Sequence, residues 1–148
     1  MRGVIDPNDY PFAYIANAAF ADLTKWIDFN QPPPHAPQIE TTSSMPPTIV
    51  FDQFGNALGG VRTPFVEVPT ATYTPTDTVA HTTVFSGFCF LYGYNTPFSD
   101  STLDSLYSSH SDYFGKVLLD SDALVAQGFW LAPDAQVVVQ KARNADVP

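Results

Sequence analysis

The sequence has one cysteine, few basic residues and no long apolar run, and each shortage excludes a class of protein. A single cysteine, Cys89, allows neither an internal disulfide bond nor a metal site built from several thiolates. Six Lys and Arg residues against fifteen Asp and Glu residues give a net charge of −9, which argues against a nucleic-acid partner. Apolar runs of a few residues are far shorter than the roughly 20 residues that cross a bilayer, so we predict no membrane span.

Recognisable catalytic motifs are missing as well. A serine hydrolase of the α/β type carries its nucleophile in a G-x-S-x-G turn, because larger side chains beside the serine would clash. Glycines stand four residues apart only at Gly55 and Gly59, and the residue midway between them is Ala57, which cannot attack a substrate. The histidines share no metal-ligand spacing, so we predict neither a metal nor a cofactor site.

What the sequence does contain is enough apolar material for a folded core. Hydrophobic residues make up 45% of the chain and aromatic residues 14%. Disordered segments contain far smaller fractions of both. Fourteen prolines among 148 residues predict that much of this core lies under irregular loops. A chain of this length fits one domain, and its element pattern predicts an α+β fold.

The first part of the chain should be a helix followed by an extended connector. Apolar residues recur every three or four positions from Pro11 to about Phe29, which indicates a helix, and Asp9 offers a cap before it. We expect residues 1–30 to be the N-terminal segment that contains this helix, and the proline-rich stretch 31–47 to connect it to the rest.

Residues 48–98 should be rich in β-structure. Strands are predicted at Thr48–Phe54, Val61–Val68 and Thr82–Tyr92, with a glycine-rich turn over residues 55–60. Cys89 falls in the third strand, where a buried inert thiol is the favoured interpretation.

Residues 99–148 should form about three helices. The first is capped by Ser99 or Asp100, the second runs from about Ser111 to Gln127 and ends at Gly128, and the third opens at Pro133.

Two groups of residues are candidates for function. His110 and Asp112 have the side-chain types of a catalytic site, but neighbours in sequence rarely point at each other, so caps of adjacent helices are the favoured interpretation. Arg62 follows the glycine turn and precedes Glu67 by five residues. Its guanidinium suits either a substrate carboxylate or an ion pair within the chain, and the ion pair is favoured.

Four stretches carry a family resemblance. The longest is FGNALGGVRTPFVEVPTATY at residues 54–73; YNTPFS at 94–99 and AQGFWL at 126–131 follow it, and PPPHAP at 32–37 precedes it. Together they resemble the "alpha/beta hydrolase domain" family of esterase-like proteins, and the resemblance covers nearly the whole chain.

The resemblance implies a Ser/His/acid ester hydrolase whose nucleophile and histidine lie upstream of the region matched here. None of those residues carries over to this sequence. The chain is then the C-terminal portion of an α/β-hydrolase-type protein of secreted or periplasmic type, which shapes the cleft and is inactive by itself. Its partner would be the upstream hydrolase portion or a second polypeptide, and its ligand a small ester, with Arg62, Tyr73 and Tyr92 as substrate-binding candidates.

Two other functions stay open. One is a non-catalytic binding module that presents an aromatic face, formed by Phe65, Tyr73, Phe88, Tyr92 and Tyr94. The other is a new hydrolase that uses His110 and Asp112. The first helix has apolar residues on more than one stripe, so we expect another polypeptide to contact it and the strand Thr82–Tyr92.

Overall fold

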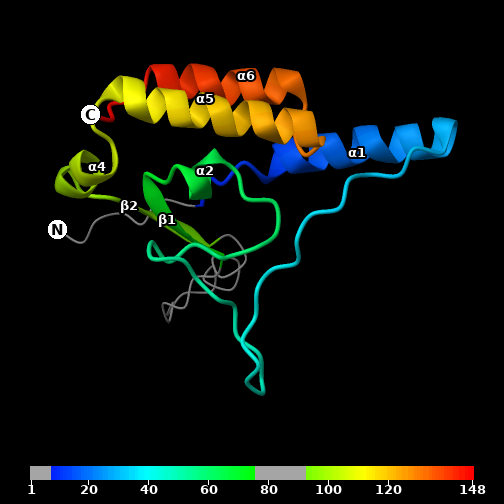
Figure 1. Ribbon diagram of the computed structural model, residues 1–148, viewed down its shortest axis with the longest axis horizontal. Helices are drawn as coiled ribbons and strands as arrows, with labels where there is room; N and C mark the ends of the chain where they lie inside the picture. The colour runs from blue at the N-terminus through cyan, green and yellow to red at the C-terminus, as the bar shows by residue number, and fades with distance from the viewer. Residues whose placement is uncertain (1–7, 76–92) are drawn as a thin grey trace, which may run out of the picture.

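A computed structural model of the chain describes residues 8–75 and 93–148. Figure 1 shows the arrangement of the helices and the two short strands in these ranges. The strands pair antiparallel, and the predicted α+β class is confirmed. None of the described helices is both long enough and apolar enough to cross a membrane. The elements are α1 (Phe12–Phe29), α2 (Pro64–Glu67), β1 (Ala71–Thr74), β2 (Tyr94–Pro97), α4 (Asp100–Leu106), α5 (His110–Gln127) and α6 (Ala132–Arg143).

Helices α5 and α6 form an antiparallel pair that holds most of the core (Figure 1). Gly128 ends α5 in the left-handed conformation, at a φ of 85°, and Pro133 lies in the first turn of α6. Both residues suit these places, because glycine tolerates positive φ and proline needs no N–H partner at a helix start. The side chains buried in the pair include Val117, Leu124, Trp130, Ala135, Val138 and Ala142.

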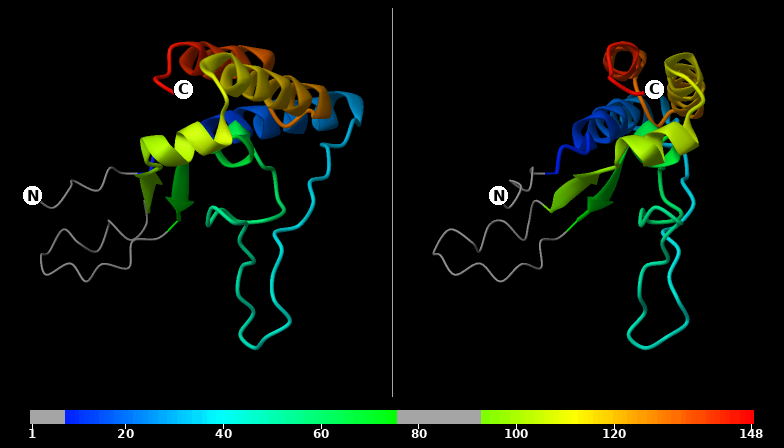
Figure 2. Two further views of the ribbon diagram at one scale, coloured as in Figure 1. Left: turned by 60° about the vertical axis from the view of Figure 1, so that its left-hand side comes forward. Right: turned by 90° about the vertical axis from the view of Figure 1, so that its left-hand side faces the viewer.

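Helix α2 joins the helical pair to the sheet, because it contacts both α5 and β1. The register of the sheet pairs Ala71 with Pro97 and Thr74 with Tyr94. The hydroxyl of Tyr107 donates a 2.9 Å hydrogen bond to the carbonyl of Pro69, which ties the segment before α5 to the chain between α2 and β1. Figure 2 shows the sheet on the side of α2 away from α5 and α6.

Residues 38–52 form a narrow arm that projects from the body (Figures 1 and 2). Backbone hydrogen bonds hold it together, among them Thr42 N–H to the Thr48 carbonyl at 2.8 Å and Val50 N–H to the Glu40 carbonyl at 2.9 Å. Its base is tight at Gly59, where φ is +78° and an added Cβ would lie 2.0 Å from the carbonyl oxygen of Gln38. Only glycine fits this close approach of two backbones.

Helix α1 lies against the rest of the chain along one narrow side. Of its 18 residues only Ala18 and Asp22 are buried. Near its beginning, Tyr14 packs edge-on against Trp130, with ring centroids 5.8 Å apart, and the side chain of Asn17 donates to Asp134 at 3.0 Å. The later turns extend beyond the end of the α5–α6 pair (Figure 1).

Several predicted boundaries were wrong for local reasons. Residues 48–54 make isolated bridges at Ile49 and Phe51 in place of a strand, because the Asp52 side chain closes a turn right after them. Residues 61–68 are not extended throughout. Pro64 opens the one-turn helix α2, where the Thr63 carbonyl accepts hydrogen bonds from the N–H groups of residues 66 and 67.

Two helix starts also differ from the prediction. Helix α1 begins after Pro11 without a side-chain cap, and Asp9 accepts a hydrogen bond from Asn95 instead. Helix α5 begins at His110 with Ser109 as its cap, whereas Ser99 caps α4 as predicted. The predicted strand Thr82–Tyr92, with Cys89 in it, lies outside the described residues.

Candidate functional site

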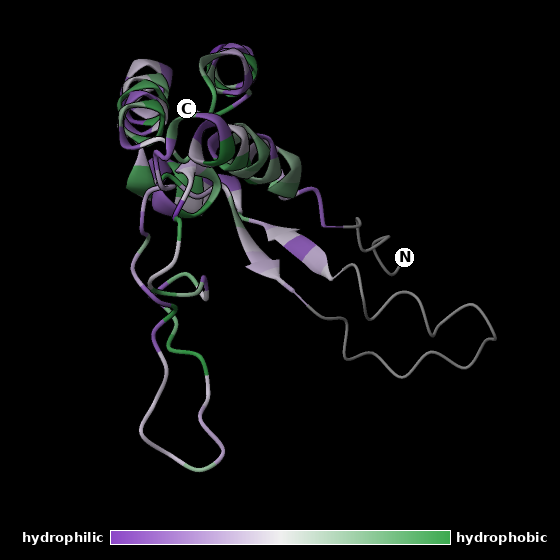
Figure 3. Ribbon diagram, turned by 90° about the vertical axis from the view of Figure 1, so that its right-hand side faces the viewer, coloured by the Kyte–Doolittle hydropathy of each residue, from purple (hydrophilic) through white to green (hydrophobic). Residues whose placement is uncertain are grey.

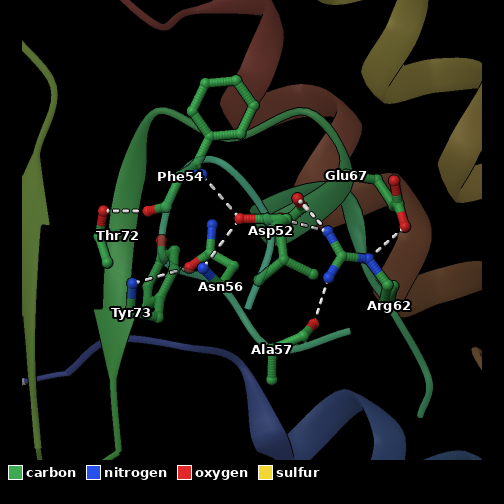
Figure 4. Close-up of polar contacts among 9 residues, drawn as sticks. Asp52, Phe54, Asn56, Ala57, Arg62, Glu67, Thr72 and Tyr73 are labelled. Carbon is green, nitrogen blue, oxygen red and sulfur yellow. Dashed lines mark hydrogen bonds and ion pairs between the residues drawn. The ribbon is translucent and has the colours of Figure 1, made fainter. Parts of the chain in front are cut away.

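The candidate site grows from a turn that the side chain of Asp52 organises. One oxygen of this carboxylate accepts hydrogen bonds from the backbone N–H groups of Phe54 and Asn56, at 2.8 and 3.0 Å. Its other oxygen lies 2.8 Å from Nη2 of Arg62 (Figure 4). Burial by itself would raise the pKa of Asp52, but the hydrogen bonds from Arg62 and from the two backbone N–H groups outweigh it and hold the pKa below its usual range.

Arg62 pins this turn to helix α2. Besides Asp52, its guanidinium donates to the Glu67 carboxylate through Nε, to the Ala57 carbonyl through Nη1 and to the Val66 carbonyl through Nη2, the last at 3.0 Å. Four of the five N–H donors therefore have partners within the chain. The ion pair predicted for Arg62 is confirmed, whereas a role in substrate binding stays a prediction.

The other side of the turn is fastened to the sheet (Figure 4). Asn56 is 1% exposed, and its side-chain oxygen accepts a 3.0 Å hydrogen bond from the backbone N–H of Tyr73. Thr72 donates from its hydroxyl to the Phe54 carbonyl at 2.6 Å. The turn is thus held from β1 on one side and from α2 on the other, so its backbone is rigidly placed.

A pocket of about 290 Å³ opens beside Arg62, between the glycine turn, α2 and α5. Two carboxyl groups line this pocket, that of Glu67 in α2 and that of Asp120 in α5. The pKa of Asp120 is raised to about 6, mainly by burial and next by the charge of Glu67, while the charge of Arg62 partly opposes both. The residues along the pocket are Pro37, Gly59, Gly60, Val61, Arg62, Glu67, Asp120, Ala123, Leu124, Gln127 and Phe129.

Replacing Asp120 with asparagine should stabilise the chain at neutral pH and change little in acid. The pKa of this carboxyl is about 6 in the folded chain against an ordinary value of 3.8. Between these values the folded state keeps a proton that the unfolded state releases, so the stability that Asp120 contributes is complete in acid and is lost as pH rises through about 6. Asparagine imitates the neutral carboxyl.

The melting temperatures of both proteins at about pH 4 and about pH 7.5 measure this difference. Asp52 and Asp112 have lowered pKa values, so the stability they contribute is lost only in stronger acid and is common to both proteins. If the variant melted no higher than the original chain at neutral pH, the charged form of Asp120 would not be destabilising the fold.

Tyr73 lies in an aromatic cluster with Tyr10 and Phe65. Its ring packs edge-on against Tyr10 at 5.6 Å and against Phe65 at 6.1 Å between centroids. Burial raises the pKa of its hydroxyl, followed by the charge of Asp9. Tyr73 and Phe65 therefore pack against each other and not side by side on an open face. Tyr94 is half-buried, and Phe88 and Tyr92 lie outside the described residues.

His110 and Asp112 have separate structural partners. The ring nitrogens of His110 lie 3.2 Å from the Val147 carbonyl oxygen and 3.1 Å from that of Arg143, so the ring ties the start of α5 to the end of α6. The prediction that His110 ends the preceding helix is therefore wrong. His110 opens α5 and contacts the carbonyls of Arg143, the last residue of α6, and of Val147 beyond it.

Asp112 caps the first turn of its own helix. It accepts hydrogen bonds from Ser108 N–H and from Lys116 Nζ, both at 3.0 Å, and the Lys116 bond is the main reason for its lowered pKa. Neither of these partners is His110, and another histidine of the chain, His35, is exposed. His81 lies outside the described residues.

Sequence reasoning missed three residues of the site. The spacing D-x-F-x-N at Asp52 is the signal of an Asx turn, and it would have placed Asp52 and Asn56 at the centre of the network. Asp120 gives no such signal, because it occupies an ordinary position within a helix. Only the packing of α5 against α2 brings it to the pocket.

Comparison with known proteins identifies the family. Residues 4–140 match the family described as alpha/beta hydrolase domain. No curated protein and no solved structure matches the chain.

Proposed function

The chain belongs to the alpha/beta hydrolase domain family, and from this membership we propose that it is the structural and cleft-shaping part of an esterase-like hydrolase, not catalytic by itself. As the C-terminal portion of such a protein, it would place a pre-formed wall beside a reaction centre that another portion supplies. This proposal makes Arg62 and the residues it fixes part of a binding surface for a small ester.

The composition of the pocket beside Arg62 carries the proposal. The described residues along this pocket include one guanidinium, two carboxyls and one amide, but neither serine, cysteine nor histidine. Such a wall can orient and hydrogen-bond a ligand, while attack on an ester needs an activated nucleophile and a base. The network around Arg62 supplies the rigidity that a positioning surface requires.

The contacts of His110 and Asp112 also support the proposal that the chain is not catalytic by itself. Both make structural contacts at helix ends. The hydroxyl of Ser108 contacts the Asp112 carboxylate, and the hydroxyl of Ser109 accepts from the backbone N–H of Asp112. Because the imidazole is held by the carbonyls of Arg143 and Val147, it is not aimed at either serine. A triad assembled from these residues would need the start of α5 to separate from the end of α6 and the residues after it.

We expect the purified chain to leave p-nitrophenyl acetate and butyrate unhydrolysed above the rate of buffer. A fluorophosphonate probe should also fail to label it, because labelling requires an activated serine. The His110→Ala variant is the control for trace activity. Turnover that survives purification and disappears in this variant would contradict the proposal and favour the hydrolase that uses His110 and Asp112.

A further inference from the structure

A second pocket lies between α2, α5 and α6 and shares no residue with the pocket beside Arg62. Its volume is about 130 Å³, and seven of the ten residues along it are apolar. Part of its wall belongs to the core, because Val117, Val138 and Ala142 are 1%, 4% and 4% exposed. Figure 3 looks along α5 and α6, whose ribbons carry both hydrophobic and hydrophilic colours, as expected of helices with one side in a core. The second pocket is therefore an apolar recess whose walls the core holds in place.

The three polar residues along the second pocket can all donate hydrogen bonds. They are Thr70, Tyr113 and Lys141, and no carboxylate stands among the residues along this pocket. Tyr113 is 9% exposed, yet its hydroxyl makes no hydrogen bond to another residue that the structure describes. Burial raises the pKa of this hydroxyl, which therefore keeps its proton at neutral pH. A donor buried to this extent is costly unless a ligand or a water supplies the acceptor.

Lys141 brings a positive charge to the rim of the second pocket, because it lines the pocket and is itself exposed. Lys25, Arg62 and Lys116 are each paired with a carboxylate. Lys141 forms no ion pair within residues 8–75 and 93–148. A cation beside a pocket without carboxylates stands out in a chain whose net charge is −9. Its charge favours an anionic group at the opening of the pocket.

We propose that the second pocket binds a short monocarboxylic acid, with the aliphatic chain in the recess and the carboxylate at Tyr113 and Lys141. Apolar walls accept the hydrocarbon, and a few convergent donors fix the orientation of the polar end. The volume limits the length of the chain, since an engineered apolar cavity of about 150 Å³ holds benzene, a molecule of six carbons. Hexanoate is therefore the first probe. The inference goes beyond the proposed function, because it concerns another pocket and requires no catalytic partner.

Two other kinds of occupant fit the second pocket less well. A purely apolar molecule would leave the Tyr113 hydroxyl without an acceptor. Inorganic phosphate would pair with the donors, but its remaining oxygens would face apolar walls. A short carboxylic acid has one apolar end and one anionic end, which match the recess and its rim.

The length of the aliphatic chain tests the recess. The full-length protein is titrated at neutral pH with propionate, butyrate, hexanoate, octanoate and decanoate, and binding is followed by nuclear magnetic resonance. We expect the affinity to rise about fourfold for each methylene up to hexanoate, which is the gain for burying one such group. Octanoate and decanoate should gain nothing more, because the recess is then full. A gain that continues to decanoate would indicate adsorption on an apolar surface and would overturn the proposal, as would absence of hexanoate binding in the millimolar range.

The polar end is tested with conservative substitutions. Tyr113→Phe keeps the ring and should weaken hexanoate binding roughly tenfold, the loss of a hydrogen bond to a charged group. Lys141→Gln should weaken it about two- to fivefold, because an exposed charge contributes less. The matched controls are Tyr14→Phe and Lys25→Gln, which lie off the pocket and should bind hexanoate as the original chain does. Circular dichroism verifies that each variant is folded. Unchanged binding by Tyr113→Phe, or equal binding of 1-hexanol and hexanoate by the original chain, would overturn the proposal.

The position of hexanoate in the original chain is tested without any substitution. Its addition should shift the backbone amide signals of Val68, Val117 and Ala142, which lie along the second pocket. Shifts at Gly60 and Gln127 in their place would assign the acid to the pocket beside Arg62 and would overturn the proposal. Inorganic phosphate in excess should leave hexanoate bound. Displacement by phosphate would show a site for small anions in general and would also overturn the proposal.

Discussion

Replacing Trp130 with alanine should lower the free energy of unfolding by about 3–5 kcal/mol, the range found for large-to-small changes of buried aromatic residues. Trp130 is 2% exposed and follows the turn between α5 and α6, so its ring closes the end of the helical pair. It also supports Tyr14 at the start of α1. Because small domains are stable by only about 5–15 kcal/mol, the loss would leave the chain near its unfolding threshold.

Urea unfolding followed by circular dichroism measures this effect. The control is Trp26→Ala, because Trp26 is 49% exposed and its removal leaves no cavity in the core. Trp130→Phe should restore part of the loss by filling most of the space. If Trp130→Ala and Trp26→Ala unfolded at the same urea concentration, Trp130 would not be a core residue in solution.

Replacing Arg62 with alanine should lower the free energy of unfolding by about 2–3 kcal/mol. The substitution leaves Asp52 without its cation and the Ala57 and Val66 carbonyls without a donor. Fully buried pairs lose about 3–5 kcal/mol when one partner is removed. The side chains of Arg62 and Asp52 are each 15% exposed, so water compensates part of this loss.

The melting temperature of Arg62→Ala should therefore fall, and Arg62→Lys should recover little of it, because an ammonium cannot reach four acceptors in the geometry of a guanidinium. Arg143→Ala is the control, since Arg143 is exposed and lies over the Phe114 ring at 5.3 Å. An unchanged melting temperature combined with weaker ester binding would show that Arg62 serves the ligand and not the fold.

Helices were predictable from the sequence where their own residues determine their ends. The three-four spacing of α1, the Ser99 cap of α4 and the left-handed Gly128 after α5 all appear in the structure as expected. Each depends on contacts within a few positions, which is the range over which periodicity and capping carry information.

The β-rich region was less predictable because distant contacts decide its form. Residues 48–54 have strand propensity, yet the Asp52 side chain turns the backbone after three residues and Arg62 stabilises that turn from ten positions away. The pocket depended on still longer contacts, since Asp120 and Glu67 meet only because α2 packs on α5. A residue pattern cannot indicate a neighbour that only folding brings into place.

The pairing of Thr74 with Tyr94 has a consequence for how this chain tolerates change in length. The backbone leaves the sheet and re-enters it at adjacent positions, and Gly93 allows this, since an added Cβ there would lie 2.0 Å from the Thr74 carbonyl oxygen. The pairing of β1 with β2 therefore holds the two ends of the intervening stretch next to each other, whatever its length. The entropy of closing a segment rises only slowly with its length. A change in the number of residues between Thr74 and Tyr94 therefore carries only a small entropic cost for closing the sheet.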